Sequence, residues 1–326
     1  MPKRRYQQRR ASSNYHKSSS QSGVKRYTKQ EVSHNRVVAL LTAVIVLVLV
    51  GVMGFAALAP SSEPTQAETE TQGQGSAASG QESAAQGQES AAQGDLAWRD
   101  SDFAVDPNRT DWNYTDNGRK VVYLTIDDGP SENTQAVLDI LDRYGCKATF
   151  FVVGHNPDYF PMIKEAYDRG HTIGLHTLTH DYAYIYSSQQ AYFEDLDAIG
   201  GVVRDQIGYV PCFIRFPGGS SNSISENYTS GIMSALVGEV QARGYQYYDW
   251  NVSSGDGSDH TADDLVYFAT EEASDYENIV LLMHDSATKQ TSVEALPRII
   301  EYYQERGYTF EAIDRTTFVP HHGVNN

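Results

Sequence analysis

The chain has 326 residues, of which 40% are hydrophobic and 11% aromatic. This content supports one large or two small folded domains and excludes a wholly disordered chain. Two cysteines exclude a disulfide framework and a Cys-rich zinc module. The formal charge is −17 for the whole chain and −26 beyond residue 36. Since phosphate contacts need clustered Lys and Arg, this acidic body argues against a nucleic-acid partner.

The N-terminal region has the organisation of a membrane anchor. Residues 1–36 carry ten basic groups and one acid, which predicts a basic cytoplasmic tail. The uncharged run from Val37 to Ala59 has 23 residues, enough to cross a hydrocarbon core of about 30 Å. The alternative is a signal peptide cleaved after Ala59, but this run is longer than usual for one. We therefore expect a single-pass protein of the cell membrane, with its larger part extracellular.

A low-complexity segment follows at residues 60–95. It consists mostly of Gly, Ser, Ala, Gln and Glu, and the heptapeptide GQESAAQ occurs at 80–86 and again at 87–93. Coiled coils share the period of seven, but here Ala is the only apolar residue and every repeat contains Gly. The segment is therefore predicted to be a flexible linker.

From residue 119 the chain alternates between short β-rich runs and helical stretches. This alternation predicts an α/β domain over 119–315 with parallel strands and crossover helices, forming either an open sheet or a closed barrel. Residues 96–118 are treated as its N-terminal extension and 316–326 as a C-terminal tail. The expected strands are 121–126, 148–153, 172–175, 212–216, 245–250, 279–283 and 308–313, and the expected helices lie near 133–144, 158–169, 188–206, 230–243, 261–274 and 292–306. Ser131 or Asn133 is expected to cap the first helix.

Chemistry in such folds lies at the carboxyl ends of the strands. There the sequence TIDDGP places Asp127 and Asp128 side by side. Two adjacent carboxylates at a strand end are energetically costly unless a cation or a basic partner holds them. The alternative is that the same residues form an Asx turn before the next helix. HTLTH places His176 and His180 on one face if the segment turns helically, although a chance pair on a solvated face has the same spacing. Asp128 with the two histidines makes a facial set with open positions, which suits zinc or another divalent ion.

Three further strand ends carry polar groups. RFPGGS contains Arg215, DWNVSSGD contains Asp249 and Asp256, and LLMHD contains His284. Each is weak alone, because an Arg is more often in a surface pair and a lone His is more often structural or exposed. Their shared position at successive carboxyl ends favours one common site.

These motifs, in this order and spacing, resemble those of the polysaccharide deacetylases with a NodB homology domain, which form carbohydrate esterase family four. TIDDGP resembles the first family motif, T-F-D-D-G-P, and HTLTH the second, H-[ST]-x-x-H. RFPGGS, WNVSSGD and LMH stand at the other three motifs. The resemblance covers about residues 119–315 and is to the peptidoglycan N-acetylglucosamine deacetylases in particular. It implies a distorted (β/α) barrel and metal-dependent removal of N- or O-acetyl groups from a glycan.

The resemblance implies Asp128, His176 and His180 as ligands of a divalent metal. Zn²⁺ is expected, and Co²⁺, Ni²⁺ or Mn²⁺ suits the same donors. The backbone amide of Gly218 would stabilise the oxyanion together with the metal. Leu282 would line a small pocket for the acetyl methyl group.

The resemblance also implies an acid–base pair. Asp127 would be the general base, with Arg215 as its ionic tether. His284 would be the general acid that protonates the leaving amine. Its orienting carboxylate would be Asp256, with Asp249 as the alternative.

Three positions depart from the family motifs. Ile126 stands where Phe is usual, a core change of tolerable volume. Gly218 stands in place of a Tyr and Gly257 in place of a Trp, so two rings that shape the cleft are missing. Trp250 is expected to fill the groove beside Gly257.

The leading hypothesis is therefore a membrane-tethered deacetylase whose catalytic domain acts outside the cell on peptidoglycan N-acetylglucosamine. Its linker would reach on the order of 30–35 Å as a random coil, which is close to the wall. The alternatives are another glycan (chitin oligomers, acetylated xylan or poly-N-acetylglucosamine) or a catalytically silent cell-wall-binding module. The complete set of ligands, base and acid favours an enzyme, and the absence of H-E-x-x-H and G-x-S-x-G disfavours a metalloprotease or a serine esterase.

Cys146 and Cys212 stand at the starts of two inner strands. An extracellular location permits a disulfide, and buried free thiols fit equally well, so both alternatives stay open.

Overall fold

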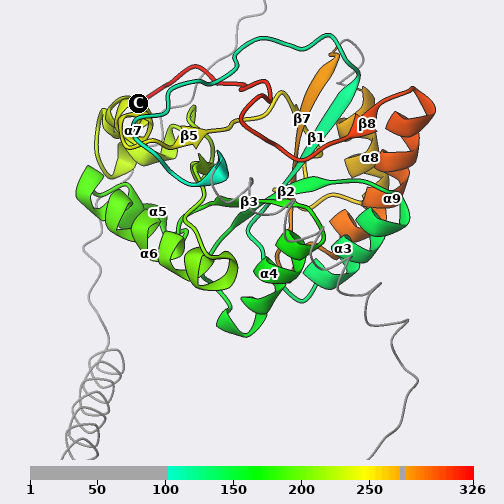
Figure 1. The fold of residues 1–326 in the computed structure, drawn as a ribbon, viewed down its shortest axis with the longest axis horizontal. Coiled ribbons are helices and arrows are strands. Elements are labelled where there is room, and N and C mark those ends of the chain that lie inside the picture. The colour runs from blue at the N-terminus through cyan, green and yellow to red at the C-terminus, as the bar shows by residue number, and fades with distance from the viewer. Residues whose placement is uncertain (1–101, 272–275) are drawn as a thin grey trace, which may run out of the picture. The chain divides into compact units, whose positions relative to one another are not determined.

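The structure, a computed structural model, describes residues 102–271 and 276–326, which are built around a curled parallel sheet (Figure 1). The predicted basic tail, anchor and linker at residues 1–95 lie outside the described residues. Within the described ranges, no helix is both long and apolar enough to cross a membrane.

The sheet has eight strands in the order β5-β4-β3-β2-β1-β7-β6, with β8 beside β1, and all pairings are parallel. The strands are β1 (Val121–Asp127), β2 (Ala148–Val152), β3 (Thr172–Leu175), β4 (Phe213–Ile214), β5 (Gln246–Tyr247), β6 (Val252–Ser253), β7 (Asn278–His284) and β8 (Thr309–Phe310). Because β5 and β6 end the order, the sheet is an open half-barrel and the expected barrel does not close.

The strands near the open side are short. Strands β4, β5 and β6 have two residues each, too few for a long ladder. After β5, the carbonyl groups of Tyr248 and Asp249 accept hydrogen bonds from the Arg215 side chain, at 2.7 and 3.0 Å. These two residues thus hold the buried guanidinium of Arg215.

The helices lie around the outside of the curled sheet (Figure 1). They are α3 (Thr134–Arg143), α4 (Pro161–Asp168), α5 (Tyr182–Ile185), α6 (Gln189–Ile207), α7 (Ile232–Ala242), α8 (Ala262–Glu271) and α9 (Gln290–Glu305), with 3₁₀ turns η1 (Pro157–Tyr159) and η2 (Ile224–Asn227). All six expected helices are present, and α5 is an addition. Asn133 stands at the N-cap position of α3, as one of the two expected caps, but its side chain makes no cap hydrogen bond. The Ser131 hydroxyl donates to Asp285 and accepts from the backbone N–H of Asn133 at 3.0 Å.

The two longest strands, β1 and β7, form the centre of the core. Every side chain of β1 is buried, which is typical of a parallel strand covered on both faces. The register pairs Asp127 with His284 at the carboxyl ends of these strands. The backbone thus brings one proposed base and one proposed acid to neighbouring positions.

The segments on either side of the expected domain pack against it. Phe103 is buried and stacks edge-on against Phe213, at 5.1 Å between ring centroids. At the other end Val319 is buried, and the backbone N–H of Asp249 donates to the carbonyl of Pro320 at 3.1 Å. Residue Asn326 reaches the start of α7, where its side-chain oxygen accepts from the backbone of the residue before the helix.

Both cysteines are free and buried. Burial raises the pKa of Cys146 to about 11 and that of Cys212 to about 12, so both thiols are protonated at neutral pH. Of the two alternatives left open by the sequence, the structure has the buried thiols.

Candidate active site

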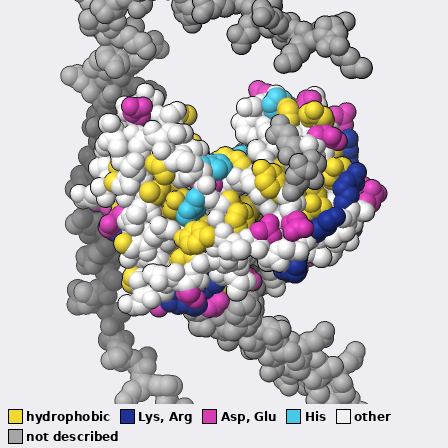
Figure 2. All heavy atoms as spheres, turned by 90° about the horizontal axis from the view of Figure 1, so that it is seen from above, with side chains coloured by type: hydrophobic (Ala, Val, Ile, Leu, Met, Phe, Trp, Pro, Cys, Tyr) yellow, Lys and Arg dark blue, Asp and Glu magenta, His cyan; other side chains and the backbone are white. Residues whose placement is uncertain are grey.

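A cleft of about 330 Å³ opens at the carboxyl ends of the central strands. In Figure 2 the molecule is hollowed between two raised parts, and histidine side chains gather beside the hollow. Eight of the ten predicted site residues line the cleft. Its lining consists of Asp127, Asp128, His176, His180, Tyr182, Phe216, Gly218, Trp250, Gly257, Leu282, His284 and Lys289. The other two predicted residues, Arg215 and Asp256, are buried and contact residues of the lining.

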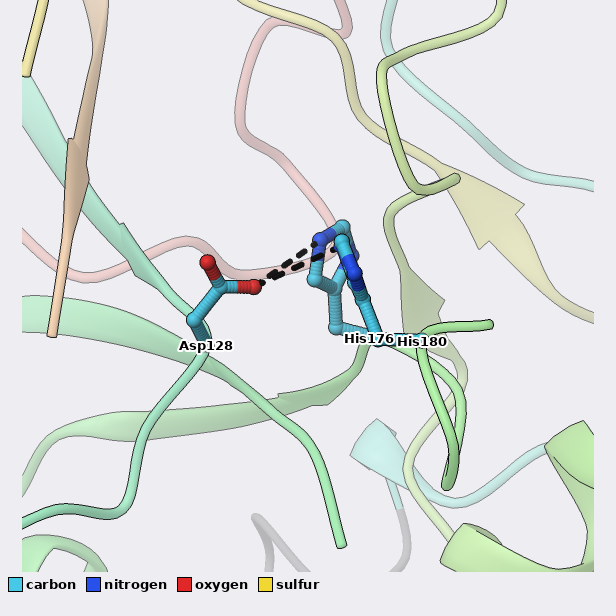
Figure 3. Close-up of side chains that lie close together, drawn as sticks. All are labelled: Asp128, His176 and His180. Atoms are coloured by element: carbon cyan, nitrogen blue, oxygen red, sulfur yellow. Dashed lines mark ion pairs between the residues drawn. The ribbon is translucent and has the colours of Figure 1, made fainter. Parts of the chain in front are cut away.

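Asp128, His176 and His180 converge on one point of this cleft. Figure 3 shows the carboxylate of Asp128 directed at both imidazole rings. Its Oδ1 lies 3.5 Å from Nε2 of His180 and 3.7 Å from Nε2 of His176. The three ligand atoms all lie within 4.8 Å of one another, which is close enough to share one ion. The expected metal-ligating set is thus brought together.

The chemistry of these three side chains fits a divalent cation. The Nδ1 of His176 lies 2.8 Å from the carbonyl oxygen of Arg215, and because a carbonyl only accepts, Nδ1 carries the proton and Nε2 has its lone pair free. Burial lowers the pKa of His176 to about 3, which keeps the ring neutral. Asp128 Oδ1 is buried and has no hydrogen-bond partner. A bound cation would satisfy this oxygen.

The two ligand-bearing turns differ from the sequence expectation. The segment after β3 is not helical: Thr177 and His180 have positive φ angles of 71° and 48°, and this turn brings the two rings to 5.1 Å between centroids. Strands β1 and β3 are also not neighbours, because β2 lies between them. The convergence depends on the turns that follow β1 and β3 and not on a helical face.

Asp127 is buried beside the metal site and paired with Arg215. The guanidinium Nη1 donates to Asp127 Oδ1 at 2.9 Å and to the hydroxyl of Thr125 at 2.7 Å. The other carboxylate oxygen, Oδ2, lies 3.7 Å from Nε2 of His176 and is not used by Arg215. Burial raises the pKa of Asp127, and the charge of Arg215 opposes this rise. The result is a tethered carboxylate with one oxygen directed to the site.

His284 forms a charge pair with Asp256 on the other side of the cleft. Its Nδ1 lies 2.7 Å from Oδ1 of Asp256, and its backbone N–H donates to Oδ2 at 2.8 Å. Although burial opposes it, the hydrogen bond and charge of Asp256 raise the pKa of His284 to about 9. The alternative partner, Asp249, instead accepts hydrogen bonds from Ser220 and from the backbone of His322. The carboxylate in contact with His284 is therefore Asp256.

Sequence reasoning missed three residues of the cleft: Tyr182, Phe216 and Lys289. A Cβ atom added to Gly218 would lie 2.7 Å from the hydroxyl of Tyr182. The Tyr182 hydroxyl therefore occupies the space that a side chain at position 218 would need. The position of Tyr182, two residues after His180, is the sequence feature that could have indicated it. Trp250 and Gly257 line the same cleft.

A second cavity, of about 380 Å³, shares Asp128 with the first. Its wall includes Glu132, His155, Asn156 and Tyr159. The carboxylate of Asp128 thus borders two spaces.

An open parallel sheet that carries an Asp-His-His set, a buried carboxylate and a His–Asp pair at one edge is typical of metal-dependent hydrolases. The class follows from the site, since the fold alone would host many activities.

Comparison with known proteins gives the family. Residues 114–232 match the polysaccharide deacetylase family. The chain is 32% identical over 209 residues to a peptidoglycan-N-acetylglucosamine deacetylase of Bacillus cereus, covering 62% of this chain and 72% of that protein. The catalytic domain of peptidoglycan N-acetylglucosamine deacetylase from Eubacterium rectale is 44% identical with a TM-score of 0.64, covering 68% of this chain and 100% of that one. A polysaccharide deacetylase from Bacillus cereus is 32% identical with a TM-score of 0.51, covering 60% and 92%.

The chain belongs to the polysaccharide deacetylase family, carbohydrate esterase family four, as the motifs predicted. It is accordingly a hydrolase that acts on carbon–nitrogen bonds.

Proposed function

We propose that the protein removes N-acetyl groups from peptidoglycan N-acetylglucosamine, using a divalent metal. The observation that carries this proposal is the meeting of a metal-ligating set, a tethered carboxylate and a cationic His in one cleft. The peptidoglycan deacetylases similar to this chain support the choice of substrate.

Asp128, His176 and His180 would hold the metal. When bound, a divalent metal supplies Lewis-acid activation of the acetyl carbonyl and of a water molecule. Zn²⁺ fits one carboxylate and two imidazoles, and Co²⁺, Ni²⁺ and Mn²⁺ also accept these donors.

Asp127 and His284 move the protons in this proposal. Asp127 accepts the proton of the attacking water at Oδ2, because Oδ1 is engaged by Arg215. His284 holds a proton on Nε2 and delivers it to the departing amine nitrogen, which is a poor leaving group without it. Asp256 occupies Nδ1 and thereby fixes which nitrogen faces the substrate.

The remaining cleft residues orient the substrate. Gly218 and Leu282 both line the cleft. The backbone N–H of Gly218 would stabilise the oxyanion, and Leu282 would contact the acetyl methyl group. The two cavities that meet at Asp128 suit a polymer, because sugars on either side of the reacting one need space. We further propose that residues 37–59 anchor the enzyme in the membrane and place the catalytic domain outside the cell.

The test is acetate release by the purified full chain from four substrates: N-acetylated peptidoglycan, chitin oligomers, acetylated xylan and poly-N-acetylglucosamine. We expect the highest kcat/KM on peptidoglycan and complete loss of turnover after chelation, restored by Zn²⁺. A higher kcat/KM on another glycan would reassign the substrate. Binding to peptidoglycan without acetate release from any substrate would instead indicate a silent wall-binding module.

A further inference from the structure

The unusual backbone of the described residues is concentrated at the metal site. The non-glycine residues with positive φ in residues 102–271 and 276–326 are Asp128 at 70°, Thr177 at 71° and His180 at 48°. Two are metal-ligating residues and the third lies between His176 and His180. L-residues rarely adopt this conformation, and it persists only where surrounding contacts impose it. The groups that impose it should therefore control the metal site.

Asp195, on α6, holds the turn between the two histidines. Its side chain is buried, and its carboxylate accepts hydrogen bonds from the backbone N–H groups of Leu178 and Thr179, the latter at 3.1 Å. These two donors lie directly inside the turn. Hydrogen bonds from N–H groups to a buried carboxylate are among the stronger ones in proteins. Asp195 touches neither imidazole, so its effect on them runs through the backbone.

Asp285 holds the turn that follows Asp128. Its buried carboxylate accepts hydrogen bonds from the hydroxyls of Ser131 and Thr134, both at 2.5 Å. Its own backbone N–H donates to the carbonyl of Asp127 at 2.7 Å. A Cβ on Gly129, the residue after Asp128, would lie 2.9 Å from Asp285 Oδ2, so the turn packs directly on this carboxylate.

We propose that Asp195 and Asp285 are positioning residues of the metal site, each holding one ligand-bearing turn in its left-handed conformation before the metal binds. The inference rests on the metal-binding part of the proposed function. Without Asp195 the turn loses the acceptor of two N–H groups and relaxes, which separates the two imidazoles. Without Asp285 the turn at Gly129 loses its support, and Asp128 swings away from the histidines.

The test is Zn²⁺ affinity of the full chain, measured by competition with a chelator. Asp195→Ala and Asp285→Ala should each bind Zn²⁺ 10- to 100-fold more weakly, the usual effect of removing a group that orients a metal ligand. Asp195→Asn and Asp285→Asn keep an acceptor oxygen and lose the charge, and they should recover affinity to within about threefold of the wild type. The matched control is Thr172→Val, which removes a buried hydrogen bond to Ile313 at the other end of β3 and should lower the melting temperature only.

Three results would each overturn the proposal. Wild-type Zn²⁺ affinity in both Ala variants would show that the turns keep their conformation without these carboxylates. Equal losses in the Ala and Asn variants would show that charge, and not positioning, attracts the metal. If Asp285→Ala does not fold, Ser131→Ala removes the hydrogen bond to Asp285 and the acceptor of the Asn133 backbone N–H with no change of charge, and a loss below twofold in this variant would refute the proposal. Normal Zn²⁺ binding without acetate release would contradict only the proposed function.

Discussion

Replacing Asp256 by Asn tests the acid side of the mechanism. Asp256 is the buried partner that raises the pKa of His284 from an ordinary 6.5 to about 9. A shift of this size corresponds to about 3 kcal/mol of stabilisation of the charged imidazole. In the variant the two largest raising interactions are lost; the charges of Asp127 and Asp128 still raise the pKa of His284, while burial, the largest single influence, still lowers it. The pKa of His284 should therefore fall from about 9 toward its ordinary 6.5.

The expected loss of activity follows from the protonated fraction. At pH 7.5 a group with a pKa of about 9 is almost fully protonated, whereas one with a pKa of about 6.5 is protonated in roughly a tenth of the molecules. Asp256→Asn should therefore lose up to about tenfold in kcat/KM at pH 7.5. Its alkaline limb should move from near pH 9 toward pH 6.5.

The assay is acetate release between pH 5.5 and 10, with Ser292→Ala as the matched control. Ser292 donates a hydrogen bond to Asp256 Oδ2 at 2.7 Å, so its removal should leave the His284–Asp256 contact in place and shift the alkaline limb only slightly. An alkaline limb at the same pH in Asp256→Asn and in the wild type would refute the assignment of His284 as the acid.

The same pKa makes a prediction for stability. A group whose folded pKa is raised stabilises the fold fully below its unfolded pKa, near 6.5, and this contribution is lost as pH rises through about 9. Urea unfolding should therefore show the wild type losing stability between pH 7 and pH 10 by more than Asp256→Asn does. Parallel losses in the two proteins would contradict this linkage.

Three further substitutions separate the other parts of the site. His176→Ala should abolish metal retention and turnover together, as judged by metal analysis and acetate release; turnover without metal would break the mechanism. Asp127→Asn should keep the metal and lose about 10²- to 10⁴-fold in kcat, and unimpaired hydrolysis would place the base elsewhere. Gly218→Ala should lower the free energy of unfolding in urea by about 1–2 kcal/mol, because Gly218 has a φ of 77° and faces the Tyr182 hydroxyl. Unchanged stability in this variant would show that the turn adapts to the added methyl group.

The parts of the fold that could be predicted from the sequence are those whose signal is local. Strand β1 is a continuous apolar run that is followed by a turn signal, and it begins at Val121, as expected. The expected runs 212–216 and 245–250 contain β4 and β5, but each of these strands has only two residues, and β6, also of two residues, was not expected. No local pattern indicates that the sheet stays open, because its two end strands, β5 and β6, have two residues each and do not pair with one another.

The candidate site divides in the same way. Its reactive side chains stand in motifs with fixed spacing and could be recognised individually. The turn that joins His176 to His180 could not be, because it is imposed by Asp195 on a separate helix. A spacing of four residues is ordinarily helical, and only a contact from another element shows that it is not. Tyr182 was missed for a related reason, since its role depends on the space left at Gly218.

The backbone at Asp128 explains how two adjacent aspartates can take two different roles. In a regular strand, consecutive side chains point to opposite faces, so Asp127 and Asp128 could not both reach the cleft. The positive φ of Asp128 ends the strand, and both carboxylates line the same space. One is then held by Arg215 and the other faces the two histidines. The left-handed turn thus lets one short motif present two carboxylates to the cleft, one as the proposed base and the other as the proposed metal ligand.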